Sequence, residues 1–173
     1  MLMKKMLLFV FYIAISCHVS TVKAQGNADA LMKQGQEFLA NKEYVKARST
    51  FLHAFNAFVA KGQSDKATYC GTRVASLYYR ENYYKEAFDI LRAADQCIVQ
   101  GEQRNNSQRP DLRYATTKER LQMYTRMRKA SSAAEQISRL DAYVNAAAND
   151  SLNKDLLYTK ASYYYTFGMT AKG

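Results

Sequence analysis

The chain has 173 residues, which is enough for one domain with its own hydrophobic core. With one Pro, seven Gly and no low-complexity tract, its composition excludes a long disordered segment. The formal charge of +10 would ordinarily indicate an acidic partner such as nucleic acid, but that inference depends on the compartment.

The N-terminus predicts export. A short basic start, MLMKK, precedes an apolar run of 12 residues, Met6 to Cys17, and the next segment ends in Val22, Lys23 and Ala24. This layout is typical of a secretory signal peptide, which we place at residues 1–24. A membrane anchor is the alternative, but 12 apolar residues span about 18 Å as a helix, whereas the hydrocarbon core is about 30 Å thick.

Export places the protein in the periplasm or otherwise outside the cytoplasm. Without residues 1–24, the chain keeps 22 basic and 15 acidic residues, a net charge of +7. Nucleic acid is therefore not an expected partner. A second alternative at the N-terminus is lipidation at Cys17, because the preceding Ala14, Ile15 and Ser16 loosely resemble a bacterial lipobox.

One spacing of residues recurs along the rest of the chain. Its first copy is Leu31, Gly35, Phe38, Tyr44, Ala47, Phe51 and Ala54. The second copy is Gly71, Ala75, Tyr78, Tyr84, Ala87, Leu91 and Ala94. A more divergent third copy is Thr117, Leu121, Tyr124, Ala130, Ala133, Ile137 and Leu140.

This spacing resembles that of the tetratricopeptide (TPR) repeat, a helix–turn–helix unit, over a domain that we place at residues 25–173. Small residues allow two helix backbones to approach, and the large residues between them recur every three or four positions. We therefore predict an all-α superhelix of antiparallel hairpins, about three TPR-like repeats plus one unpaired C-terminal helix. The predicted helices are 27–40, 44–61, 65–80, 84–100, 111–127, 131–147 and 153–171, with one long loop, Gly101 to Asp111.

The last predicted helix looks like the first helix of a fourth repeat. Tyr and other large residues lie around much of its circumference, whereas a helix that ends a repeat array usually has a polar outer face. We expect either a chain that forms the N-terminal part of a longer polypeptide, or a terminal helix whose Tyr hydroxyls tolerate water. The layout resembles the extracytoplasmic sensor region of Bacteroidetes transmembrane histidine kinases and regulators, in which a membrane connection would come from a downstream segment.

The sequence carries no catalytic motif. After the signal peptide there is one His, His53, which we expect on a helix face near the core. A single His without a Cys or carboxylate cluster cannot form a zinc site, and no Gly-rich phosphate loop or nucleophile motif is present. We expect no enzyme and no cofactor, and two function classes remain open. These are a binding or sensor module and a stand-alone envelope assembly scaffold for protein–protein interactions. An accessory domain of an enzyme, fused to a catalytic part outside this sequence, is a third alternative.

The TPR resemblance implies where a ligand would bind, because the first helix of each hairpin lines the concave face of such arrays. It nominates nine groove residues: Tyr69, Thr72, Ser76, Tyr79, Arg80, Lys118, Gln122, Thr125 and Arg126. Residues 104–129 carry eight basic and two acidic residues, a net charge of +6. This stretch is either a solvated face or part of a groove for a protein or peptide, acidic in character, or for an anionic glycan.

Cys70 and Cys97 could form a disulfide across the second hairpin, because export favours oxidation. Their distances from the turn near Asn82 differ by three residues, however, or about 4.5 Å along a helix. A bridge needs Cα atoms within about 7 Å, so buried free thiols remain the alternative.

Overall fold

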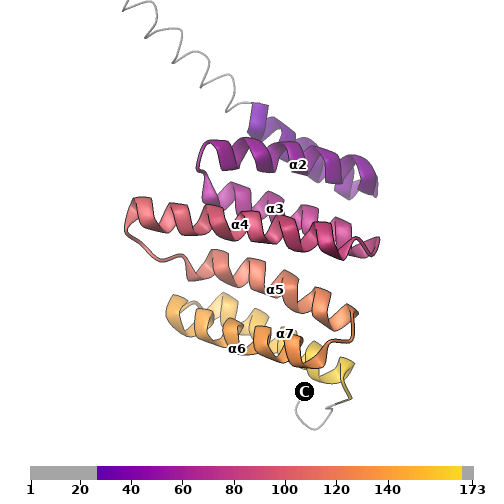
Figure 1. Ribbon diagram of the computed structural model, residues 1–173, viewed down its shortest axis with the longest axis vertical. Coiled ribbons are helices and arrows are strands. Elements are labelled where there is room, and N and C mark those ends of the chain that lie inside the picture. Colours follow the sequence, from indigo (N-terminus) through magenta and orange to yellow (C-terminus); the bar gives the residue numbers. More distant parts are fainter. Residues whose placement is uncertain (1–26, 169–173) are drawn as a thin grey trace, which may run out of the picture.

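The computed structural model describes residues 27–168, and within that range it consists of helices without strands (Figure 1). The predicted signal peptide and Cys17 lie outside the described residues. A first helix covers residues 27–40. It is followed by α2 (Tyr44–Ala60), α3 (Ser64–Arg80), α4 (Tyr84–Asn105), α5 (Pro110–Arg126), α6 (Ala130–Ala147) and α7 (Asp150–Thr166).

Consecutive helices pack side by side, which confirms the prediction of an all-α array of hairpins. The pairs α3–α4 and α5–α6 are the most closely associated, and α7 packs against both α5 and α6 (Figure 1). Among the first helices of the hairpins, α3 contacts α5 and α5 contacts α7. These three helices therefore form one continuous layer, on which a ligand could contact several repeats.

The turn inside each hairpin has the same geometry. Two residues after the first helix ends, Lys42, Asn82 and Arg128 have φ values of 62°, 67° and 57°. In each case the next residue donates its N–H to a carbonyl five positions earlier, as in the bond from Tyr83 N to Tyr78 O at 3.1 Å. This left-handed turn satisfies the last carbonyls of the first helix and reverses the chain into the second helix.

The core follows the small and large positions of the repeat. Ala47, Ala87 and Ala133 are fully buried. In the first hairpin, a Cβ added to Gly35 would lie 2.9 Å from a ring carbon of Phe51, so only glycine permits this approach. The prediction from spacing is therefore confirmed at the level of individual contacts.

The long loop predicted at residues 101–111 is wrong. Helix α4 continues to Asn105, and only residues 106–109 connect it to α5. Gly101, which reads as a helix breaker, is buried inside α4, where an added Cβ would lie 2.4 Å from the Ser64 hydroxyl oxygen. Asn106 follows the end of α4 as its C-cap, and its left-handed conformation (φ 46°) closes the last turn.

The last helix also differs from its predicted bounds. Helix α7 begins at Asp150, three residues before the expected start, because the Asn149 side chain accepts hydrogen bonds from the N–H groups of Ser151 and Leu152. Asn is a favoured N-cap for this reason. The helix ends at Thr166, so the predicted end at residue 171 is wrong at least for residues 167–168; residues 169–171 lie outside the described range.

Candidate binding site on the first-helix layer

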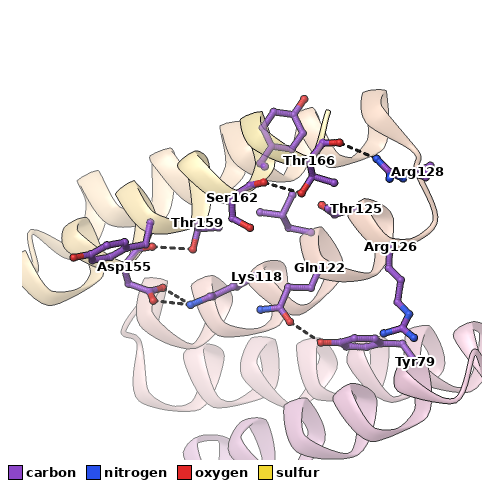
Figure 2. A pocket seen from close by; sticks show the side chains of 13 residues that line it. Tyr79, Lys118, Gln122, Thr125, Arg126, Arg128, Asp155, Thr159, Ser162 and Thr166 are labelled. Atoms are coloured by element: carbon purple, nitrogen blue, oxygen red, sulfur yellow. Dashed lines mark hydrogen bonds and ion pairs between the residues drawn. The ribbon is translucent and has the colours of Figure 1, made fainter. Parts of the chain in front are cut away.

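A pocket of about 580 Å³ opens on the layer of first helices (Figure 2). Helices α5 and α7 form its two walls, and α3 contributes a residue at one end. It is lined by Tyr79, Lys118, Leu121, Gln122, Thr125, Arg126, Arg128, Asp155, Tyr158, Thr159, Ser162, Tyr163 and Thr166.

A short hydrogen bond joins α3 and α5 at the edge of the pocket. The Tyr79 hydroxyl donates to Gln122 Oε1 over 2.5 Å (Figure 2). The Tyr79 side chain is buried, and burial raises the pKa of its hydroxyl to about 12, so the hydroxyl stays protonated as a donor. The bond therefore orients the Gln122 amide at the edge of the pocket.

A charged pair links α5 and α7, the two walls of the pocket. Lys118 Nζ donates to both carboxylate oxygens of Asp155, at 2.6 and 2.7 Å, and the Tyr114 hydroxyl donates to Asp155 Oδ2 at 2.6 Å. Burial acts to raise the pKa of Asp155, but these hydrogen bonds outweigh it and hold the pKa below its usual value. Asp155 therefore stays ionised and cancels the charge of Lys118.

Two arginines, Arg126 and Arg128, also line the pocket. The guanidinium of Arg126 donates to Arg80 O at 3.3 Å, and that of Arg128 donates to Thr166 O at 2.8 Å. These carbonyls lie at the C-terminal ends of α3 and α7, where the helix dipole favours a cation. Within residues 27–168 neither side chain pairs with a carboxylate. A guanidinium has five N–H donors, so each keeps several for a ligand.

The remaining lining is rich in hydroxyl groups. Thr159 and Thr166 donate to carbonyls one turn earlier in α7, those of Asp155 and Ser162, both at 2.8 Å (Figure 2). Tyr158 lies at the rim with 80% of its surface exposed. The pocket thus combines unpaired guanidinium donors, hydroxyls and an exposed aromatic ring.

Five of the nine groove residues nominated from the sequence line this pocket, and they come together from α3 and α5. They are Tyr79, Lys118, Gln122, Thr125 and Arg126.

The other four nominated residues lie elsewhere on α3. The Tyr69 hydroxyl accepts a hydrogen bond from Gln36 Nε2 at 3.0 Å, and Thr72 donates to Tyr69 O at 2.9 Å. Ser76 lies beside the Tyr79 hydroxyl. The Arg80 guanidinium lies 4.3 Å from the ring centroid of Tyr44, outside the pocket.

The residues that the sequence analysis did not nominate belong mainly to α7 and the turn after α5. They are Leu121, Arg128, Asp155, Tyr158, Thr159, Ser162, Tyr163 and Thr166. The interpretation of α7 as the first helix of a fourth repeat could have predicted them, because it places α7 in the same layer as α3 and α5.

Glu119, which neighbours the nominated positions, faces Arg73 and Tyr79 of α3. Its Oε2 atom is buried and has no hydrogen-bond partner among the described residues. Burial raises the pKa of this carboxyl to about 7, although Tyr79, Arg73 and Lys118 act in the opposite direction. Glu119 does not line the pocket, and a pKa of about 7 means that its charge changes near neutral pH.

Four of the eight basic residues in the stretch 104–129 form ion pairs. Its ion pairs reach carboxylates on other elements or nearby in the chain: Arg109 with Asp65 and Asp111, Arg113 with Glu102, Lys118 with Asp155, and Arg120 with Asp95. Positive charge without a carboxylate partner is therefore confined to a few side chains, of which Arg126 and Arg128 line the pocket.

The two cysteines are free and buried, so the structure contains no bridge between Cys70 and Cys97. Burial raises the pKa of Cys70 to about 12 and that of Cys97 above its usual value. Because the thiolate is the reactive form, this suppresses their oxidation. His53, expected near the core, is exposed on α2, so that expectation is wrong.

Other classes of site receive no support from residues 27–168. Within that range no three His, Cys, Asp or Glu side chains group as metal ligands, and no helix is both long and apolar enough to cross a membrane. Comparison with family models, with curated proteins and with solved structures finds no match.

Proposed function

We propose that this protein is an extracytoplasmic, TPR-like binding module without catalytic activity of its own. Its ligand is a carboxylate-bearing segment of a protein or peptide, held in the pocket between α5 and α7. The closest functional analogy is the sensor region suggested by the sequence layout, in which ligand binding on the array would be read by another part of a signalling protein.

The observation that carries the proposal is the pair of guanidinium groups at Arg126 and Arg128. Both line the pocket, both are exposed, and neither pairs with a carboxylate among the described residues. A guanidinium binds a carboxylate through two parallel hydrogen bonds, and hydrogen bonds to charged groups contribute about 1.5–3 kcal/mol. The neighbouring Tyr158 ring offers a surface for apolar or aromatic groups of the same ligand.

A stand-alone assembly scaffold is the second candidate, and the exposed aromatic surface of α7 favours it. Leu157 is 62% exposed and Tyr165 is 79% exposed, although both are large and apolar in character. A scaffold would use such a surface for protein contacts and would not require the pocket.

Binding of a fluorescein-labelled oligoglutamate peptide, followed by fluorescence anisotropy, tests the proposal. The variant Arg126→Ala/Arg128→Ala should weaken binding at least about tenfold, which corresponds to 1.4 kcal/mol. The matched control, Lys85→Ala/Arg92→Ala, removes the same charge from exposed positions on α4 and should leave binding close to wild type.

Circular dichroism of both variants shows whether the helices are retained. Added salt should weaken binding to the wild type, since exposed charges are screened beyond about 8–10 Å. Equal weakening by the two variants would indicate attraction to net charge alone and would contradict the pocket assignment. Binding of an oligogalacturonate but not of the peptide would assign the site to an anionic glycan instead.

A further inference from the structure

Helix α7 exposes a stripe of apolar and aromatic side chains. Leu157, Tyr158 and Tyr165 are 62%, 80% and 79% exposed, and Ala161 lies between them, also exposed. The one charged residue from Leu157 to Gly168 is Lys160, whose amine pairs with Asp141 at 2.5 Å. Protein interfaces have such cores, depleted in charge and enriched in Tyr.

This stripe contains the pattern of a first helix. Leu157, Ala161 and Tyr164 have the intervals of Leu31, Gly35 and Phe38 in the first hairpin. In the earlier hairpins a second helix covers these positions, and Ala75 and Leu121, which correspond to Ala161, are 0% and 2% exposed.

The turn after α7 also repeats the earlier ones. Gly168 has a φ of 73° and follows the helix end by two residues, as Asn82 does after α3. The same left-handed turn follows α2 at Gly62 (φ 63°), so the turn at Gly168 is compatible with α7 acting as either helix of a hairpin.

The same stripe also carries the pattern of a second helix. Second helices in this protein show Tyr, a small residue, a large residue and a small residue at fixed intervals, as in Tyr84, Ala87, Leu91 and Ala94. Helix α7 repeats these intervals with Tyr158, Ala161, Tyr165 and Gly168. One exposed face therefore has both halves of the contact that holds a hairpin together.

We propose that two copies of this protein pair through α7, antiparallel and around a twofold axis. Each α7 then serves as the second helix of the other copy. Ala161 packs against Tyr165 of the second copy, as Gly35 packs against Phe51 within the first hairpin. Leu157 packs against Gly168 of the second copy, as Gly71 packs against Ala94 within the second hairpin. There, a Cβ added to Gly71 would lie 3.3 Å from Ala94 Cβ.

The register of this pairing is consistent with twofold symmetry. In an isologous interface, if Ala161 contacts Tyr165 of the second copy, then Tyr165 contacts Ala161 of that copy, and the two pairs occur at the same crossing. The opposite end of the array offers no such surface, because the exposed residues of the first helix include Lys33, Gln34 and Glu37. Pairing through α7 therefore closes as a dimer and does not propagate as a filament.

Sedimentation velocity and multi-angle light scattering of the purified protein, from low to high micromolar concentration, test the proposal. The wild type should shift from monomer to dimer as concentration rises. Tyr165→Glu places an unpaired charge in the interface and should raise the dissociation constant at least about tenfold. Tyr83→Glu, the same substitution at an exposed tyrosine on the turn between α3 and α4, should leave the dimer unchanged.

Two results would overturn the proposal. A wild type that stays monomeric at the highest concentration would show that a second copy does not occupy this face, and binding of a peptide with the sequence of α4 would then assign it to a foreign helix. A dimer that persists in the Tyr165→Glu variant, with helix content retained, would place the interface elsewhere. Oligoglutamate binding by the Tyr165→Glu variant tests the pocket separately from the dimer, because Tyr165 does not line the pocket.

Discussion

Replacing Glu119 by Gln should change how the stability of this protein depends on pH. The carboxyl has an ordinary pKa of 4.5, which burial raises to about 7 in the folded state. Between these two values the folded protein holds a proton that the unfolded chain releases, so stability falls as pH rises. One pKa unit corresponds to 1.36 kcal/mol, and the shift of about 2.5 units gives a loss of about 3 kcal/mol by pH 8.

The groups that face Glu119 oppose this rise in pKa but do not cancel it. Arg73 and Tyr79 approach from α3, and Lys118 precedes it on α5; each favours the ionised form, but their combined effect is smaller than that of burial. Below about pH 4.5 the residue is protonated in both states and contributes no pH dependence.

Urea denaturation of the wild type and of Glu119→Gln, from pH 4.5 to pH 8, measures the effect. Gln keeps the shape of the carboxylic acid and has no charge, so the variant should gain about 2–3 kcal/mol relative to wild type across this range. Glu135→Gln removes an exposed carboxylate on α6 and serves as the matched control. A difference between Glu119→Gln and wild type that stays constant with pH would refute the reasoning.

Two further predictions concern the core. Ala87→Leu adds three carbons at a fully buried site, which costs about 1–3 kcal/mol and should lower the melting temperature by about 2–12 °C. The control Lys85→Ala, at an exposed site, should not lower it, and equal melting temperatures of the two variants would contradict the packing register. Cys70 and Cys97 should resist a thiol reagent in the folded protein and both react after unfolding without reductant, as mass spectrometry of the labelled peptides can show; a failure of both to react after unfolding would indicate a disulfide.

The fold could be predicted because its decisive contacts repeat in the sequence. Tyr84, Ala87 and Leu91 follow the intervals of the first hairpin, and a close crossing of two helices needs small residues at such positions. The end of α4 could not be predicted from intervals. Gly101 has low helix propensity, but α4 continues through it, and it lies buried beside Ser64, which is 37 residues away in the sequence.

The candidate site was predictable on α3 and α5 and missed on α7. Residues such as Tyr79 and Gln122 could be predicted because each lies between core positions of a helix whose register follows from the repeat spacing. Asp155 and Thr159 required the bounds of α7, which depend on the Asn149 cap, and the contact of α7 with α5. Local sequence favours a cap, but it does not state which neighbouring helix the residue after it will face.

The basic stretch shows why net charge does not locate a ligand site in a repeat protein. Several of its ion pairs join consecutive repeats, as do Arg109 with Asp65 and Lys118 with Asp155, at sequence separations of 44 and 37 residues. Each such pair contributes little to stability, but it removes one cation from those available to a ligand. Among the arginines of this stretch that pair with no carboxylate, Arg126 and Arg128 lie over helix C-termini, where a backbone carbonyl satisfies one N–H group of each. A binding site on this array is therefore indicated by guanidinium groups with spare donors, and the density of positive charge along the chain is a poor guide to it.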